Sequence, residues 1–347
     1  MLIFTGCGAT TAVPAESAAA TGESAVPEQA SLVPAGEGKT TYPLALESTW
    51  GTTELAVQPQ RIAAVTPSSD DAEILAALGV TPIIASEWAT DVFLEEALTQ
   101  PIPERFTTGD SQFPVEQIAK ANPDLIITLG ADVSEVYDKL SSIAPVLSTA
   151  TDRGGEASVA SDWEHNIRSL GEALDLQDKA QEVLDDERTF FEQFRAEHPE
   201  LAGKTAAYLV YYGAESGLQY HSSPDGPATT VFSRMGFAEN PNAAKFEYRQ
   251  AVSPELLSLV DADVIVFSDN SDGNYAEITE LPLFKNLEAA KDNHVMLIDN
   301  RAAEGEFIID GVTSVGNLPW ALARSGPLSS VWAAKQMAPA LSATVQR

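Results

Sequence analysis

Short apolar runs rich in β-branched residues alternate with amphipathic stretches from Tyr42 onward. A run of four to eight apolar residues predicts a buried strand, and apolar residues spaced three or four apart predict a helix. Asp70–Leu78 has the helical spacing and ends at Gly79. The predicted strands are Arg61–Thr66, Pro82–Ser86, Asp124–Leu129, Pro145–Ser148, Thr205–Tyr211, Asp263–Ser268 and His294–Asp299. Such alternation is typical of an α/β fold.

Two segments of this pattern resemble each other. Val115–Ile127 and Pro254–Val266 superpose without a gap, at a constant offset of 254 − 115 = 139 residues. Each predicts a short helix with a glutamate near its start, a tight turn that ends in Asp, and a buried strand. The chain is therefore expected to hold two similar Rossmann-like α/β lobes, with a ligand cleft between them.

Residues 161–199 separate the two predicted lobes and are helical in pattern throughout. One apolar stripe runs from Trp163 to Leu174, and a second follows a break expected at Asp175. The second helix, about Gln177–Glu197, would be roughly 30 Å long at 1.5 Å per residue. A rigid helix of this length could run along both lobes and would permit only modest closure of the cleft.

The first forty residues differ from the rest of the chain. Residues 1–7 end in Thr5-Gly6-Cys7 and resemble the remnant of a bacterial lipoprotein signal peptide, whose cysteine becomes acylated. The positively charged region that opens such peptides is missing, so we expect the true start to lie upstream. Residues 8–40 are rich in Ala, Ser, Thr, Pro, Gly and Glu, which predicts a disordered tether. The N-terminal lobe would then span residues 41–160 and the C-terminal lobe residues 200–347.

Charge and cysteine content narrow the classes of function. The 20 Lys and Arg against 51 Asp and Glu give 20 − 51 = −31, a charge that repels nucleic acid. Cys7 is the single cysteine, which excludes an internal disulfide and a thiolate zinc cluster. Beyond residue 7, no apolar run approaches the roughly 18 residues that span a bilayer. We therefore expect a water-soluble body outside the cytoplasm, held at the bacterial cell membrane by Cys7.

The order of these segments resembles that of the helical-backbone class of ABC-importer solute-binding proteins. The resemblance covers nearly all of Tyr42–Leu341, and the ferric-siderophore branch is the most similar. The segments that carry it are Trp50–Leu55, Gln58–Ile62, Glu73–Val80, Pro114–Thr128, the long helix, Val252–Phe267 and Leu281–Asp299. The resemblance implies that the protein captures a ferric siderophore and delivers it to a permease dimer with its ATPase. No catalysis and no cofactor are implied, because iron would be bound only as part of the siderophore.

Several aromatic, arginine and serine residues follow the predicted strands, where ligands gather in open α/β sheets. Rings can cover the apolar or π surface of a ferric chelate, while guanidinium groups pair with its oxygen atoms. Trp320, further along the chain, is expected equally in the core or in the cleft. The predicted ligand-binding residues are Ser68, Trp88, Tyr212, Tyr248, Arg249 and Arg301.

The glutamates of the repeated segments, Glu116 and Glu255, are predicted to dock on the permease. The resemblance implies one such glutamate on each lobe, placed to meet arginines of the two permease subunits. Independently, a pseudo-symmetric protein that meets a two-fold dimer should present equal charges at equivalent points. The alternative is that both glutamates only complement a helix N-terminus.

Other ligands and an enzyme were weighed against this prediction. A bare divalent metal would need several convergent histidines, whereas the chain has only His165, His198, His221 and His294, scattered along it. Haem, with His221, Met235 or Tyr212 as an axial ligand, stays an alternative, as does cobalamin. An extracellular α/β hydrolase is remote, because the Gly-x-Ser-x-Gly, Walker-type and His-Glu-x-x-His motifs are all absent. Asp70 and Asp71 are interpreted as acids at a helix N-terminus.

Overall fold

The computed structural model describes residues 31–108, 113–129, 131–148, 162–224 and 226–347. Leu32–Arg347 form one compact unit. Cys7 and most of the predicted tether lie outside the described residues. Within the described ranges, no helix combines the length and apolar character needed to cross a membrane.

The N-terminal lobe is a five-stranded sheet in the order β5-β4-β3-β6-β7, and all of its strand pairs are parallel. An antiparallel hairpin, β1–β2, precedes it. The central strands β3 and β6 are buried at every position, which explains why they read as continuous apolar runs. The elements are β1 (Leu44–Ser48), β2 (Gly51–Leu55), β3 (Ile62–Ala64), α1 (Asp70–Ala77), β4 (Ile84–Ser86), α2 (Val92–Ala97), β5 (Glu104–Phe106), α3 (Val115–Ala121), β6 (Leu125–Thr128), α4 (Tyr137–Ser141) and β7 (Val146–Ser148).

The C-terminal lobe is a seven-stranded mixed sheet in the order β10-β9-β8-β11-β12-β13-β14. Its centre, β8-β11-β12, is parallel, and both edges are antiparallel. The strands are β8 (Ala206–Tyr211), β9 (Leu218–Tyr220), β10 (Gln250–Ala251), β11 (Val264–Asp269), β12 (Val295–Arg301), β13 (Glu306–Ile309) and β14 (Val312–Val315). The helices are η1 (Pro199–Leu201), α7 (Gly213–Ser216), α8 (Pro227–Met235), η2 (Ala243–Lys245), η3 (Pro254–Leu259), α9 (Ala276–Thr279), α10 (Pro282–Lys285), α11 (Glu288–Lys291), α12 (Leu318–Arg324) and α13 (Pro327–Val345).

The predicted repeat is present in three dimensions at the predicted register. β6 and β11 begin at Leu125 and Val264, which are 264 − 125 = 139 residues apart. Asp124 accepts hydrogen bonds from the backbone N–H of Gln60 and Arg61, while Asp263 accepts one from the backbone N–H of Thr205. Each aspartate thus ties the start of its strand to the start of a parallel neighbour. The preceding helix differs, because α3 is an α-helix and η3 is a 3₁₀ helix.

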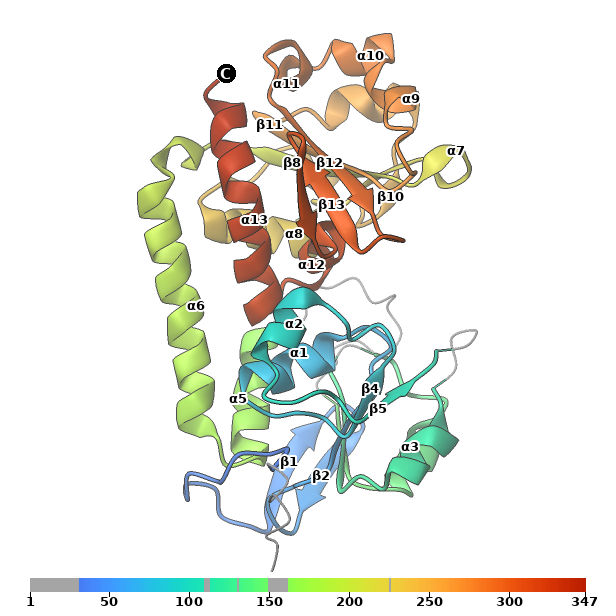
Figure 1. Ribbon diagram of the computed structural model, residues 1–347, viewed down its shortest axis with the longest axis vertical. Coiled ribbons are helices and arrows are strands. Elements are labelled where there is room, and N and C mark those ends of the chain that lie inside the picture. Colours follow the sequence, from blue (N-terminus) through green and yellow to red (C-terminus); the bar gives the residue numbers. More distant parts are fainter. Residues whose placement is uncertain (1–30, 109–112, 130, 149–161, 225) are drawn as a thin grey trace, which may run out of the picture. The chain divides into compact units, whose positions relative to one another are not determined.

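Two helices, α5 (Trp163–Ala173) and α6 (Gln177–Glu197), connect the lobes. They match the predicted pair, and Asp175 between them has a left-handed φ of 57° that ends the first helix. Figure 1 shows α6 running beside both lobes with α13 next to it. The predicted C-terminal lobe, residues 200–347, therefore ends in a helix that also packs on α1 and α2 of the N-terminal lobe.

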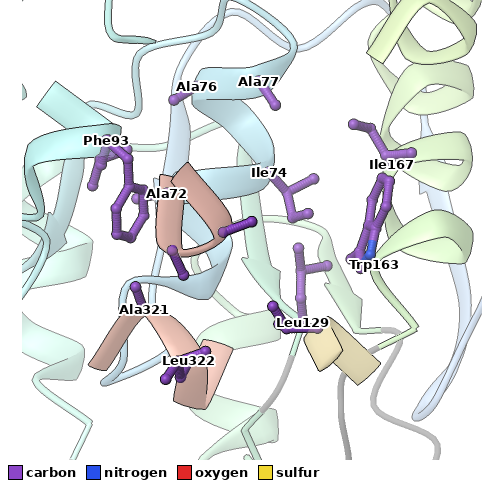
Figure 2. Close-up of a cluster of buried hydrophobic side chains, with 14 of the residues drawn as sticks. Ala72, Ile74, Ala76, Ala77, Phe93, Leu129, Trp163, Ile167, Ala321 and Leu322 are labelled. Atoms are coloured by element: carbon purple, nitrogen blue, oxygen red, sulfur yellow. The ribbon is translucent and has the colours of Figure 1, made fainter. Parts of the chain in front are cut away.

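One hydrophobic cluster extends through both lobes. In Figure 2, side chains of α1 lie between Trp163 and Ile167 of α5 on one side and Ala321 and Leu322 of α12 on the other. Phe93 of α2 belongs to the same cluster. The helical layer thus joins the two sheets through packed side chains as well as through the chain connection.

Part of the predicted tether is folded. Val33 is buried, and the Asp175 carboxylate accepts hydrogen bonds from the backbone N–H of Gly38, Lys39 and Thr40, each at 2.7 Å. These bonds hold the pKa of Asp175 below its usual value. The prediction that the tether extends to Thr40 is therefore wrong at its C-terminal end. This segment has few apolar residues to bury, but hydrogen bonds from its backbone to the Asp175 carboxylate hold it in place.

Candidate ligand-binding site

A cavity of about 420 Å³ lies where the C-terminal ends of strands from both lobes meet. The connection from β3 to α1 supplies Ser68 and Asp70, while Tyr212 and Asn270 directly follow β8 and β11. The N-terminal half of α12 closes the cavity with Asn317, Pro319 and Trp320. The remaining lining residues are Tyr208, Val210, His221, Tyr248, Arg249, Ala323 and Arg324.

Four of the six residues predicted to bind ligand line this cavity: Ser68, Tyr212, Tyr248 and Arg249. The other two do not line it. Trp88 is 58% exposed, and its indole N–H donates to the Thr108 hydroxyl at 3.2 Å. The guanidinium of Arg301, at the end of β12, is held by Asp299 at 3.1 Å. These placements do not test ligand contact, which stays a prediction for all six.

The wall formed by the C-terminal lobe is built around His221. Its ring centroid lies 5.7 Å from that of Tyr208, 6.0 Å from Tyr212 and 5.3 Å from Tyr248. Burial, with a smaller contribution from the Arg249 charge, lowers the pKa of His221 to about 3. The imidazole is therefore neutral at physiological pH. Its Nε2 is buried, and no described group forms a hydrogen bond with it.

Arg249 brings positive charge to the same wall. Its φ of 59° is left-handed and unusual for a side chain other than glycine, and its backbone N–H donates to Tyr220 O at 2.8 Å. Burial raises the pKa of Tyr248 to about 12, which Arg249 opposes in part, and it also raises that of Tyr212. Both tyrosines are therefore neutral phenols that can donate a hydrogen bond into the cavity.

Arg324, the last residue of α12, brings a second positive charge to the cavity. Its side chain is 3% exposed, and its Cζ lies 4.7 Å from the centroid of the Trp320 ring. Nη1 lies 3.5 Å from Asp70 Oδ1, and Nη2 lies 3.4 Å from Asp91 Oδ2. These are ion pairs only, since none of the three guanidinium nitrogens forms a hydrogen bond with a described residue.

Neither His221 nor Arg324 is among the residues that the sequence predicts to bind a siderophore. Both carry a signal that could have found them. Arg324 is the single charged residue of the otherwise apolar helix Leu318–Arg324, and a charge on an apolar helix needs a buried partner or a ligand. His221 directly follows β9, at the point where the chain leaves the sheet. Asp70 was interpreted as a helix N-terminal acid, yet it also lines the cavity.

Two other hollows lie away from the ends of the strands. One of about 470 Å³ surrounds α8, and one of about 670 Å³ lies between α6 and α13. Neither combines strand ends from both lobes, so the cavity between the lobes is the candidate site. Among the described residues, no group of three or more His, Cys, Asp and Glu side chains could hold a metal ion.

Comparison with known proteins agrees with this architecture. The family model described as periplasmic binding protein matches residues 62–302, more than half of the chain. The probable siderophore-binding lipoprotein YfiY of Bacillus subtilis (strain 168) is 25% identical over 261 residues, 71% of this chain and 77% of its own length. The Fe(3+)-citrate-binding protein YfmC of the same organism is 27% identical over 248 residues, covering 71% and 75%.

A solved structure shows the same fold. A periplasmic solute binding protein from Mycobacterium smegmatis str. MC2 155 superposes with a TM-score of 0.69 at 22% sequence identity. The match covers 87% of this chain and 98% of that one. The two-lobed fold with a helical backbone, expected from the sequence, is therefore confirmed.

Proposed function

Because this chain belongs to the periplasmic binding protein family, we propose that it captures a ferric siderophore between its lobes and delivers it to the permease of an ABC importer. The family consists of substrate-binding transport proteins, and catalysis is not part of the proposal. The observation that carries the proposal is the cavity itself, which combines aromatic rings in edge-on and tilted contact with two arginines where strand ends of both lobes meet. The names of the relatives YfiY and YfmC support the ligand class.

In this proposal the aromatic and the polar residues of the cavity have different tasks. Tyr212, Tyr248 and the neutral ring of His221 cover the organic surface of the chelate. Arg249 and Ser68 offer hydrogen-bond donors to its oxygen atoms, on opposite walls of the cavity. No residue needs to transfer a proton or to bind iron directly, because the siderophore already satisfies the coordination of the metal.

Delivery to the permease would use the surface around one glutamate on each lobe, at the start of each repeated segment. Glu116 and Glu255 are both exposed near the starts of α3 and η3, while Ile118 and Leu257, two residues further on, are both buried. The two carboxylates thus project from equivalent points of the two lobes, as a two-fold permease dimer requires. Acylation of Cys7, which lies outside the described residues, would hold the protein at the extracytoplasmic face of the bacterial cell membrane.

Haem binding is the second candidate, because Nε2 of the neutral His221 is buried at the cavity without a hydrogen-bond partner among the described residues. Tyr212 lines the same cavity, so it also stays available as an axial ligand. Met235, the third axial ligand considered, is fully buried in α8 and does not line the cavity.

Native mass spectrometry with a panel of ligands tests the proposed function. The panel contains a ferric trihydroxamate, a ferric catecholate, ferric citrate, haem and cobalamin. We expect a one-to-one complex with at least one ferric chelate. We also expect that chelate to quench tryptophan fluorescence at sub-micromolar concentration, since Trp320 lines the cavity. Binding of haem or cobalamin alone, or of no member of the panel, would contradict the siderophore proposal.

A further inference from the structure

The charge of the cavity is opposite in sign to the charge of the chain. Among the described lining residues the charged side chains are Asp70, Arg249 and Arg324, two positive and one negative. The whole chain has a net charge of −31 and only 20 Lys and Arg. Two of these few cations thus line one cavity, and although Asp70 and Asp91 lie beside Arg324, both arginines can contribute positive charge to an anionic ligand.

Arg324 differs from an ordinary buried arginine in its unused donors. A guanidinium has five N–H donors in a planar fork, and leaving buried donors unpaired is costly. The two nearby carboxylates approach Nη1 and Nη2 only at 3.5 and 3.4 Å, and no described residue accepts a hydrogen bond from the group. The Trp320 ring covers one face of the guanidinium. The group is therefore held in place, while its buried donors have no hydrogen-bond partner among the described residues.

We propose that Arg324 pairs with an anionic oxygen edge of the bound chelate and makes the site selective for carboxylate-bearing ferric complexes. This inference rests on the proposed function and narrows its ligand class. A carboxylate matches the fork geometry of a guanidinium in a bidentate arrangement. A buried site strengthens that pairing, since little solvent screens it. Arg249, which also lines the cavity, would balance a second negative charge of such a complex.

The chain offers a matched control for this arginine. Arg234 of α8 also lies over an indole ring, that of Trp163 at 5.1 Å, and also pairs with two acids, Glu187 and Glu164. It does not line the cavity between the lobes. Arg324→Gln and Arg234→Gln therefore each remove one positive charge that lies over an indole ring beside two acids, and both should lower the melting temperature. Only Arg324→Gln should change which ligand is preferred.

The experiment measures the affinities of three ferric complexes by tryptophan quenching: ferric citrate, the neutral trihydroxamate ferrichrome and the cationic ferrioxamine B. We expect the wild type to prefer ferric citrate. Arg324→Gln should lower that affinity about tenfold or more relative to the other two complexes. Arg324→Lys keeps the charge without the planar fork, so its affinity for ferric citrate should lie between those of the wild type and Arg324→Gln. Arg234→Gln should keep the wild-type affinity ratios. The affinity ratios are informative even where a variant is less stable, provided that it stays folded at the assay temperature.

The result also separates this inference from the proposed function. Equal losses for all three complexes in Arg324→Gln would assign Arg324 a structural role and overturn the inference, as would a wild type that prefers the neutral or cationic complex. Either result leaves siderophore capture intact. A wild type that binds no ferric complex would overturn both.

Discussion

At the residue scale, one buried glutamate connects the helices α1 and α13. Glu73 of α1 is 1% exposed, and its Oε1 accepts hydrogen bonds from the backbone N–H of Leu328 and Ser329 at 2.9 and 2.8 Å. These two N–H groups belong to the first turn of α13, where the helix has unpaired donors. Burial raises the pKa of Glu73 to about 7, although the Ser329 bond and the Arg324 charge oppose the shift.

This pKa predicts how stability depends on pH. Between about pH 4.5 and 7 the folded state keeps a proton on Glu73 that the unfolded chain has lost. The stabilising contribution is therefore complete below the unfolded pKa and is lost as pH rises through about 7. We expect the free energy of unfolding to fall between pH 5 and pH 8 by an amount on the order of 2 kcal/mol from this group.

Glu73→Gln tests the prediction, because the amide keeps an oxygen acceptor for α13 and does not titrate. Urea denaturation at pH 5 and pH 8 should give a smaller difference than in the wild type. The difference should not vanish, because burial also raises the pKa of Asp71 to about 7. Glu54→Gln, at an exposed position on β2, is the control and should keep the wild-type difference. An unchanged difference in Glu73→Gln would contradict the assignment.

At the scale of single elements, the sequence predicts the buried parts best. All seven predicted strands exist, and six of them are buried at every position, since a strand covered on both faces gives a continuous apolar run. The hairpins β1–β2 and β13–β14 were missed, since each of their strands is partly exposed and gives no such run. Helix α13 was also missed. Its segment is apolar on nearly all sides, so it has no amphipathic stripe, and it is buried between the lobes.

The residues of the candidate site also divide into those that the sequence pattern predicts and those that it does not. Residues that directly follow buried strands, such as Tyr212, could be placed from the pattern. Trp88 also follows a strand, yet its indole pairs with Thr108 outside the cavity, because the pattern gives a position and not a side-chain direction. The local pattern shows Arg324 only as the single charge of an apolar helix, whereas its place beside Asp70 and Asp91 depends on the packing of α12 against the N-terminal lobe.

The repeated elements α3 and η3 carry the prediction about docking. Glu116→Gln with Glu255→Gln should leave ferric-ligand affinity and melting temperature almost unchanged, since both side chains are exposed and outside the cavity. Stimulation of the ATPase of the reconstituted transporter should fall strongly, because charged groups at the rim set orientation and association rate. The same double change at Glu54 and Glu288, two other exposed glutamates, is the control. Unimpaired stimulation would remove the docking role.

At the scale of the whole molecule, the shared helical layer limits closure. The cluster that contains Ala72, Trp163 and Leu322 includes side chains of both lobes, so a large hinge motion would expose apolar surface. We therefore expect the radius of gyration measured by small-angle scattering to change by no more than its experimental error when a ferric ligand binds. A large contraction would show that the helical layer is a hinge instead of a rigid support.

The packing of α12 and α13 also has a consequence for biosynthesis. Residues Ala72 to Ala77 of α1 are made early. Ala321, Leu322 and the N-terminus of α13 that Glu73 caps are made at least 321 − 77 = 244 residues later. Until those residues leave the ribosome, one face of α1 and the Glu73 carboxyl have no partner. The lobe that is synthesised first is therefore the lobe whose core is completed last.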